Sequence, residues 1–520
     1  GFGPRVAWLL LPACAVVLLM GVTNRLCLDV ASVPLLWVVP LALYLATFIL
    51  CFASARQHRP RLYWTIAAIS LLGYAVLDYA DLGLLSRGFR LGAIADDVPI
   101  LTALLFSSCM LLHGELERRK PDATELTAYY LSIAAGGALG GLFTGLLAPL
   151  IFDDYHELPL GLALSWIALG ALAWRGRPLP ARARRAAAAL GVVAMVLLSI
   201  VPPFARAPRP CGVELLRERS FFGVSRVMEC NPDQPRRHVK LLINGSTLHG
   251  RQLQLPAIRP VPTSYFGPLT AIGMALYDGP LGAEGIVLDG DGARPGRKIG
   301  IIGIGVGMIA GYGRAGDRIT YYEIDPEIVA IARDSGHFDY LAHSRAEIEI
   351  VLGDARLSLE RELARTGARE FDVLVVDAFS SDAIPTHLLT REAFALYARH
   401  LERDGLLAVH VSNRYLRLAP LVARVGASQG FSVLQVQNRS FAGYSSGKAL
   451  WVLLSTDAQL LEQLEQKMRA RIRDLGVRER TIAIERIRDA DLVAAPLWTD
   501  DYSNILSVLR FAPQAPRGSS

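Results

Sequence analysis

Glycines and acids follow two successive apolar segments in the second half of the chain. The run Lys298–Ile302 leads into closely spaced glycines, at Gly303, Gly305 and Gly307. A second apolar run, about 20 residues further on, ends at Glu323, with Asp325 close behind. A βαβ unit builds a nucleoside site in this way, because glycines let the backbone approach the ligand and the acid accepts hydrogen bonds from ribose hydroxyls. The spacing therefore predicts nucleoside binding, with Asp325 in the same site.

Two further acids stand at the ends of the next two apolar runs. The motif Gly353-Asp354-Ala355 is expected to bind the adenine, with the Asp354 carboxylate accepting a hydrogen bond from its amino group. Asp377 follows the buried run Phe371–Val376, where partial desolvation suits a carboxylate to act as a general base. A helix N-cap is the alternative role. Asp377 and Asp382 together bring negative charge to attract a cationic amine.

Strands alternate with helices from residue 299 onward. Strands are predicted at 299–302, 319–322, 348–351, 373–376, 406–410, 432–437 and 449–454, with helices such as 326–334 and 391–401 between them. Short, fully apolar strands joined by helical crossovers indicate a parallel sheet covered on both faces. Ligands of such sheets bind beyond the carboxyl ends of the strands, which is where the glycines and acids fall.

A small β domain is predicted at 211–255, before this sheet. It holds strand-like runs at 213–218, 224–229 and 238–243, the last leading into a turn at Asn244-Gly245. Cys211 and Cys230 flank the first two runs, so a hairpin would place them nearly opposite each other. A disulfide, which persists only in an oxidising compartment, and two unpaired thiols both remain open. Residues 256–298 are expected to form a connecting loop and helix, and 299–512 a Rossmann-like catalytic domain.

The first 205 residues have the composition of a membrane domain. The chain is 52% hydrophobic, and its mean hydropathy is +0.33, which is too apolar for an ordinary soluble protein of this size. Apolar runs of spanning length fall at about 6–23, 33–53, 62–79, 97–113, 126–151, 158–174 and 186–204. They predict an all-α bundle of about seven transmembrane helices at 1–205, in contact with a lipid bilayer. The net charge of +6 is spread over both parts, so no nucleic-acid partner is expected.

Basic residues collect in alternate loops of this membrane domain. The loops after the second, fourth and sixth spans are rich in arginine or lysine, at 56–61, 118–120 and 175–185. Because basic residues accumulate on the cytoplasmic side, seven spans would place the C-terminal part outside, where a disulfide would also persist. A nucleoside made inside the cell favours the cytoplasm instead. The sequence does not decide on which side of the membrane the C-terminal part lies.

These motifs together resemble one known family. Residues 211–510 look like the spermidine synthases, which are aminopropyltransferases, and the whole chain is similar to bacterial membrane proteins in which such a domain follows transmembrane helices. The resemblance rests on residues 303–308, 323–325, 353–355, 375–382 and 443–447. It implies that Glu323 holds the ribose, Asp354 the adenine, and that Asp377 takes a proton from the attacking amine, while Tyr444 lines the amine site.

The same resemblance implies the wider properties of the protein. The co-substrate would be decarboxylated S-adenosylmethionine, the acceptor a polyamine such as putrescine, and the product nucleoside methylthioadenosine. The location would be a bacterial inner membrane, and the assembly a homodimer. No metal is expected, because a sulfonium is already activated and the histidines and cysteines show no metal-ligand spacing.

The chain departs from the family pattern at several positions. Val306 stands where the family has an aspartate that grips the amino group of decarboxylated S-adenosylmethionine, and losing that bond costs about 1.5–3 kcal/mol. Intact S-adenosylmethionine could therefore fit. Tyr265, in Ser264-Tyr-Phe-Gly267, stands near where the family has a Tyr-x-Glu motif and is a candidate substrate-binding residue. The segment from Asp377 to Asp382 is longer than in the family, which leaves the role of Asp382 open.

Three functions from different classes follow. The first is a membrane-tethered aminopropyltransferase, the second is another S-adenosylmethionine enzyme such as a methyltransferase, and the third is a non-catalytic protein that binds or transports a polyamine or nucleoside. His249 either reaches the cleft or lies in a surface loop, and the motif Trp498–Tyr502 is expected to have a structural docking role. The glycines at 136–145 are expected to permit close helix packing.

Overall fold

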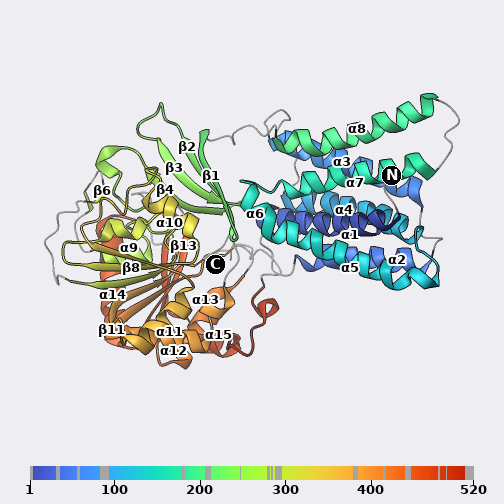
Figure 1. Cartoon of the computed structure of the whole chain (residues 1–520). Coiled ribbons are helices and arrows are strands. Elements are labelled where there is room, and N and C mark those ends of the chain that lie inside the picture. Colours follow the sequence, from blue (N-terminus) through green and yellow to red (C-terminus); the bar gives the residue numbers. More distant parts are fainter. Residues whose placement is uncertain are drawn as a thin grey trace, which may run out of the picture. The chain divides into compact units, whose positions relative to one another are not determined.

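The computed structural model divides the chain into two compact units, Gly1–Val224 and Ser225–Ser520. It describes residues 4–30, 36–54, 59–81, 93–176, 182–204, 212–245, 247–277, 281–282, 285–286, 296–378, 385–413, 416–439, 447–477, 481–487 and 489–509. Figure 1 shows a helical unit and a unit that combines sheets with helices. The predicted domain boundaries stay a prediction, because the division between the units falls inside a strand.

Each apolar run predicted to span the membrane is helical. The helices are α1 (Pro4–Asn24), α2 (Val38–Ala53), α3 (Pro60–Asp81), α4 (Ala93–Glu117), α5 (Leu126–Leu142), α6 (Ala148–Ile151), α7 (Glu157–Gly176) and α8 (Arg182–Phe204). Short π-helical turns, η1 (Arg25–Val30) and η5 (Phe143–Leu147), follow α1 and α5. Three described segments are long and apolar enough to cross a membrane, namely Arg5–Cys27, Asp97–Glu117 and Ala123–Ile151. The count of seven crossings stays a prediction.

Small residues let α1 and α5 pack backbone against backbone. A Cβ atom at Gly136 would overlap the carbonyl oxygen of Leu9, and one at Gly140 would overlap that of Ala13. The expected close packing at these glycines is therefore confirmed. The outward faces of the helices, in contrast, expose large apolar side chains, with Ile49 67% and Leu150 81% exposed.

The first strand, β1 (Gly212–Ser220), is held to the loop before α7 within the first unit. The Arg219 guanidinium makes two 3.0 Å hydrogen bonds to the Glu157 carboxylate, and both side chains are almost fully buried. Arg219 also lies over the ring of Tyr155, and Arg217 pairs with Asp154 at 3.2 Å. A buried, bidentate pair of this kind fixes where the chain goes after α8, because separating the two charges would leave each of them buried alone.

Four strands form the small β sheet, in the order β1-β2-β3-β4. They are β1, β2 (Gly223–Cys230), β3 (Val239–Asn244) and β4 (Thr247–Leu253), and the pairs β2–β3 and β3–β4 are antiparallel. The predicted turn at Asn244-Gly245 joins β3 to β4. Cys230 is disulfide-bonded, which favours the bridged reading of the sequence. Its predicted partner, Cys211, lies outside the described residues.

The main sheet has eight strands in the order β14-β12-β13-β11-β10-β7-β8-β9. They are β7 (Lys298–Ile302), β8 (Arg318–Glu323), β9 (Glu347–Leu352), β10 (Phe371–Val376), β11 (Leu401–His410), β12 (Ser432–Asn438), β13 (Ala449–Ser455) and β14 (Ile482–Glu485). The strands β7 to β11 are parallel and follow the doubly wound Rossmann order, in which the first strand lies in the middle. This part of the predicted fold class is confirmed.

The prediction of a wholly parallel sheet was wrong for the last strands. Strand β13 inserts between β11 and β12 and runs antiparallel to both, and β14 adds an antiparallel edge. The physical reason is the short connection, residues 439–448, between β12 and β13, since a parallel pair needs a crossover of a dozen or more residues.

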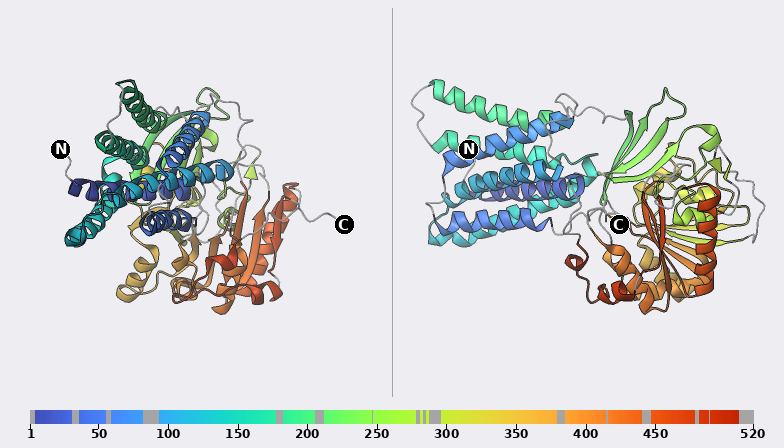
Figure 2. Two further views of the ribbon diagram at one scale, coloured as in Figure 1. Left: turned by 90° about the vertical axis from the view of Figure 1, so that its right-hand side faces the viewer. Right: turned by 180° about the vertical axis from the view of Figure 1, so that it is seen from behind.

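Helices cover this sheet (Figure 2). They are α9 (Ala271–Leu276), α10 (Pro326–Arg333), α11 (Ala355–Arg365), α12 (Arg391–His400), α13 (Leu418–Ser428), α14 (Ala458–Asp474) and α15 (Asp489–Ala494). One large apolar cluster joins α11, α12 and α13 to the central strands β10 and β11. Burial of this cluster fixes the central strands against the helices.

Candidate functional site

The loops that follow four parallel strands are tied together at one edge of the sheet. The Asp377 amide donates to the Ile302 carbonyl at 2.9 Å, which links the end of β10 to that of β7. The Gly303 amide donates to Tyr322, and the Gly353 amide donates to Glu323, which links β7, β8 and β9 in the same way. The predicted glycines and acids therefore come together at the carboxyl ends of the strands, where doubly wound sheets bind ligands.

The glycine loop needs glycine for two reasons. Gly303, Gly305 and Gly307 have φ angles of +95°, +52° and +76°, a region that side chains disfavour. In addition, a Cβ at Gly303 would collide with the Asp377 carbonyl oxygen. The loop is followed by a 3₁₀ turn, η7 (Met308–Tyr312), and not by a full α-helix. The loop backbone thus lies directly against the strand end that carries Asp377.

Glu323 lies beneath this loop and is nearly buried. Its Oε2 accepts the Ile304 amide at 2.9 Å and its Oε1 accepts the Asp325 amide at 2.9 Å. Burial raises the pKa of the Glu323 carboxyl, and the two amide donors oppose that shift. Asp325 itself caps helix α10, since its Oδ1 accepts the Glu327 amide. The cofactor roles of both acids stay predictions, and Glu323 has the better placement because it touches the glycine loop.

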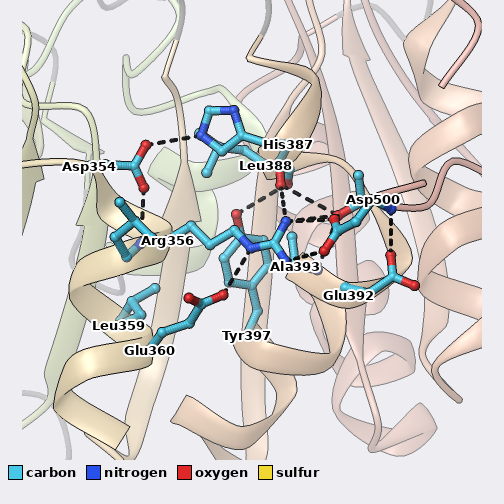
Figure 3. A network of polar contacts seen from close by, with 12 residues as sticks. Asp354, Arg356, Leu359, Glu360, His387, Leu388, Glu392, Ala393, Tyr397 and Asp500 are labelled. Carbon is cyan, nitrogen blue, oxygen red and sulfur yellow. Dashed lines mark hydrogen bonds and ion pairs between the residues drawn. The ribbon is translucent and has the colours of Figure 1, made fainter. Parts of the chain in front are cut away.

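Asp354 and Ala355 begin helix α11 at the next strand end. Asp354 Oδ1 accepts the Leu357 amide at 2.9 Å as an N-cap, and Oδ2 lies 3.0 Å from Nε2 of His387 (Figure 3). Both oxygens thus have a partner, and an adenine amino group would be an additional contact. Ala355 is the first residue of α11, whose first-turn amides lack acceptors within the helix. The predicted adenine contacts fit this position and remain predictions.

Asp377 is the start of a hydrogen-bond chain that the sequence did not reveal. Its Oδ1 lies 2.6 Å from Nδ1 of His410, and the Nε2 of His410 lies 2.7 Å from Oγ of Ser412. The Leu450 amide donates to the same Ser412 oxygen at 2.8 Å. Asp377 Oδ2 has no hydrogen bond to the described residues. The side chains of Asp377 and His410 are only 10% and 7% exposed, so a bound amine would meet a carboxylate that is largely shielded from water.

Tyr265 and Trp451 both stack on the His410 ring. Each ring centroid lies 4.7 Å from that of His410, with interplanar angles of 11° for Tyr265 and 29° for Trp451. Ser264 adopts a φ of +58°, which is a strained value for serine and turns the next residue toward the site. Burial, reinforced by the charge of Asp377, raises the pKa of the Tyr265 phenol, so the hydroxyl keeps its proton. Tyr265 therefore lies beside the predicted base, and its predicted contact with substrate stays untested.

His249 lies on strand β4 and not in a surface loop. The Tyr265 hydroxyl donates to its carbonyl oxygen at 3.0 Å, and a Cβ at Gly305 would lie 3.1 Å from that oxygen. The Nε2 atom of His249 is buried and has no hydrogen-bond partner among the described residues. Burial lowers the pKa of the imidazole, and the nearby negative charge of Asp377 opposes the shift. The sequence signal that could have identified this position is Gly250, which directly follows His249 in a strand that packs on the glycine loop.

Val306 is fully buried within the glycine loop. A Cβ at Gly250 would overlap the side chain of Val306, so the valine packs closely against strand β4. A carboxylate at this position would be desolvated without a partner, which is costly. The surroundings thus match the apolar residue that the chain carries.

The remaining predicted residues fall into two groups. Asp382 and Tyr444 lie outside the described residues. The motif Trp498–Tyr502, in contrast, docks as expected: Trp498 is buried, and Asp500 bonds both terminal nitrogens of Arg356 and the Thr390 hydroxyl (Figure 3). Among the described residues, no group of three metal-binding side chains comes together.

Comparison with known proteins finds similarity only to solved structures. No family model matches the chain, and no curated protein matches it. It is similar to the crystal structure of a probable spermidine synthase from Corynebacterium glutamicum, at 14% identity and a TM-score of 0.40, over 56% of this chain and 98% of that one.

Two other solved structures are similar over a smaller part of the chain. A spermidine synthase in complex with the transition-state analogue AdoDATO matches at 15% identity and a TM-score of 0.33, over 54% of this chain and 83% of that one. A TehB-like SAM-dependent methyltransferase from C. glutamicum matches at 19% identity and 0.23, over 32% of this chain and 83% of that one. Identities and TM-scores this low do not assign the chain to a family.

Proposed function

We propose that the α/β unit transfers an aminopropyl group from decarboxylated S-adenosylmethionine to a polyamine such as putrescine. The observation that supports this most is Asp377, a shielded carboxylate beside the glycine loop with one oxygen held by His410 and the other without a hydrogen bond to the described residues. The proposal gives that second oxygen, Oδ2, to the acceptor amine. A protonated amine has no lone pair, so the reaction requires a group that attracts and deprotonates it.

The proposed reaction is a single displacement at carbon. The amine nitrogen forms a bond to the methylene next to the sulfonium, the carbon–sulfur bond breaks, and its electron pair stays on the sulfur of methylthioadenosine. The amine proton passes to Asp377. The rest of the catalytic effect comes from holding nitrogen, carbon and sulfur in line, which requires a firmly fixed nucleoside. We assign the ribose hydroxyls to Glu323 and the adenine to Asp354 and the Ala355 amide.

The second candidate is transfer of a methyl group from intact S-adenosylmethionine on the same scaffold. The buried, apolar position of Val306 favours it, because the loop offers no acid to hold the amino group of the decarboxylated donor. Both reactions would use Asp377 and the same nucleoside contacts. They differ in the donor consumed and in the nucleoside released.

Incubation of the purified protein with putrescine and each sulfonium donor separates the candidates. Release of methylthioadenosine from the decarboxylated donor, with spermidine formed in equal amount, is the expected result. Release of adenosylhomocysteine from intact S-adenosylmethionine would establish the methyltransferase instead. Tight binding of either donor with no product would refute both and leave a binding or transport protein.

We further propose that the helical unit is inserted in a bacterial inner membrane and that the strands lie on the extracytoplasmic side. The exposed apolar faces of the helices support contact with lipid. The Arg219–Glu157 pair supports the extracytoplasmic location. It holds β1 at the start of α7, whereas the arginine-rich link to α8, residues 175–185, follows the other end of α7. Basic links stay in the cytoplasm, and a disulfide at Cys230 persists only outside it.

A membrane-impermeant thiol reagent tests this side in intact cells. Cys230 is expected to react only after an impermeant reductant has been added. The control variant Ala183→Cys, in the arginine-rich link, is expected to react only after lysis. Labelling of Cys230 that requires lysis would place the strands in the cytoplasm. The homodimer rests on the family resemblance alone and stays a prediction that light scattering in detergent can check.

A further inference from the structure

Strand pairing and aromatic stacking fix the position of the His410 side chain. It is the last residue of β11, and the register of the parallel pair, Val376 with Val409, places it directly beside Asp377. Tyr265 and Trp451 both stack on the imidazole, so the ring cannot rotate about its Cβ–Cγ bond without losing both contacts. The Trp451 indole in turn donates to the Tyr265 carbonyl at 3.2 Å, which locks the stack together.

The partners of the ring determine which nitrogen carries the proton. A backbone amide can only donate, so the Leu450 amide uses a lone pair of the Ser412 oxygen. The Ser412 hydroxyl can then donate its proton to the Nε2 atom of His410, and in that arrangement Nε2 is unprotonated. The proton of a neutral ring therefore lies on Nδ1, from which it donates to Asp377 Oδ1.

We propose that His410, oriented by Ser412, is a positioning residue that holds Asp377 as the acceptor for the amine proton. This inference rests on the proposed function. By occupying Oδ1, the Nδ1–H group fixes the carboxylate plane and leaves Oδ2 for the amine. A neutral donor also leaves the full negative charge on the carboxylate, whereas an imidazolium would offset the attraction for a cationic amine. The serine, bonded to the backbone of β13, keeps the neutral tautomer in place.

The arrangement is the converse of the one in serine proteases. There, a carboxylate orients a histidine that moves the proton. Here, the histidine stacks with two aromatic rings, and the carboxylate is the group whose second oxygen has no hydrogen bond to the described residues. The physical principle is shared, because the reactive group needs a second residue that fixes its direction.

Two substitutions of His410 test the positioning role. In His410→Phe the ring can still stack but cannot donate, and we expect kcat to fall about 100-fold, as for a small misplacement of a catalytic group. In His410→Asn the side-chain amide reproduces the Nδ1–H donor, and we expect kcat within about tenfold of wild type. Affinity for methylthioadenosine should stay within about threefold in both. Equal kcat for His410→Phe and wild type, or equal losses in the two variants, would overturn the proposal.

A further variant and a spectroscopic measurement cover the case in which both His410 variants unfold. Ser412→Ala leaves the histidine in place but frees Nε2, and a fall in kcat with unchanged nucleoside affinity is expected, whereas unchanged kcat would count against the relay. Nitrogen NMR of the histidine-labelled full chain in detergent, with His410 assigned by its substitution, should show a neutral ring protonated at Nδ1 near pH 7. A proton on Nε2, or an imidazolium, would refute the inference. This measurement needs no turnover, so it tests the hydrogen-bond arrangement of His410 even if neither donor is consumed, and the failure of the proposed function is then distinguishable from the failure of this inference.

Discussion

Two acids at the ends of parallel strands, Asp354 after β9 and Asp377 after β10, have different surroundings. Asp354 has a partner at each oxygen, the Leu357 amide and His387, and it begins a helix. Asp377 has one oxygen on His410, and Oδ2 has no partner among the described residues. The same side chain in equivalent positions thus has different free bonding capacity, which is why we propose Asp354 as a fixed acceptor for the adenine and Asp377 as the base. Fold position alone does not distinguish the two proposed roles, whereas the hydrogen-bond partners do.

The largest effect is expected from removing the proton acceptor at the reaction end. Asp377→Asn keeps the shape but cannot take up the amine proton, so turnover should fall about a thousandfold, within the range measured for general bases. Methylthioadenosine affinity should stay within a few-fold, because the adenosyl end is unchanged. Product release measured by liquid chromatography gives the first quantity and calorimetry the second.

Asp372 provides the matched control for this variant. It lies at the opposite end of the same strand, where its Oδ2 accepts the Lys298 amide. Asp372→Asn should therefore leave kcat near the wild-type value. If Asp377→Asn lost turnover and nucleoside binding together, the distinction between the two ends would be wrong.

A smaller effect is expected at His249, whose buried Nε2 has no hydrogen-bond partner in the part of the chain that the structure describes. An unsatisfied buried nitrogen is costly, and an acceptor amine near Asp377 would supply the missing bond. His249→Ala should raise KM for the acceptor about tenfold, the equivalent of one hydrogen bond. The thermal unfolding temperature should not fall along with the rise in KM, because His249 Nε2 has no hydrogen bond to the described residues that the substitution could remove.

His238 is a suitable control for His249, because it lies in the same small β region and bonds Glu229 at 2.8 Å. His238→Ala should leave KM for the acceptor unchanged. An equal rise of KM in both variants would show that the sheet as a whole is perturbed, and that His249 has no specific contact.

The smallest effect is on stability alone and belongs to the adenosyl end. Asp500→Asn weakens the ion pair with Arg356, which lies two residues after the helix cap Asp354 (Figure 3). The pair is partly exposed, so we expect a loss of about 1 kcal/mol in the free energy of unfolding at pH 7. The Arg356 guanidinium holds the pKa of the Asp500 carboxyl below its usual value of 3.8.

The pH dependence of this loss has a definite sign. A carboxyl with a lowered pKa in the folded state stabilises the protein above its unfolded pKa, and this contribution disappears as the pH falls through the folded value. The stability difference between wild type and Asp500→Asn should therefore be constant near neutrality, begin to shrink near the unfolded pKa of about 4, and vanish only below the lower pKa of the folded state. Denaturant titrations at several pH values measure it, and a difference that grew toward acid pH would contradict the assigned pair.

The sequence predicted the strand ends of the site but not its hydrogen bonds. Apolar runs identify β7 to β11, and the glycines, Glu323 and Asp377 follow from their endings. His410 and Ser412 were visible at the end of a strand, yet no pattern in the sequence states that His410 Nδ1 lies 2.6 Å from Asp377. That contact depends on the register of β10 against β11. Knowing that the fourth and fifth strands of a Rossmann sheet are neighbours would have suggested it.

Other misses have similarly physical causes. The antiparallel insertion of β13 follows from the short link that precedes it, which the alternation of strands and helices did not reveal. His249 was hard to place, because a histidine after a turn resembles a surface residue until Gly250 is seen to pack on Val306. Long-range packing decided each of these positions, and local pattern could not.

Calorimetric titration of methylthioadenosine into wild type, Glu323→Ala and Glu347→Ala tests the central claim that an adenosyl nucleoside binds at the glycine loop. Glu347 lies at the far end of the neighbouring strand, in an exposed pair with Arg318, and serves as the control. The expected result is binding by wild type and Glu347→Ala, with affinity at least about tenfold weaker in Glu323→Ala, because a charge-assisted pair of ribose bonds is lost. No heat from wild type, or equal affinity in all three proteins, would contradict it.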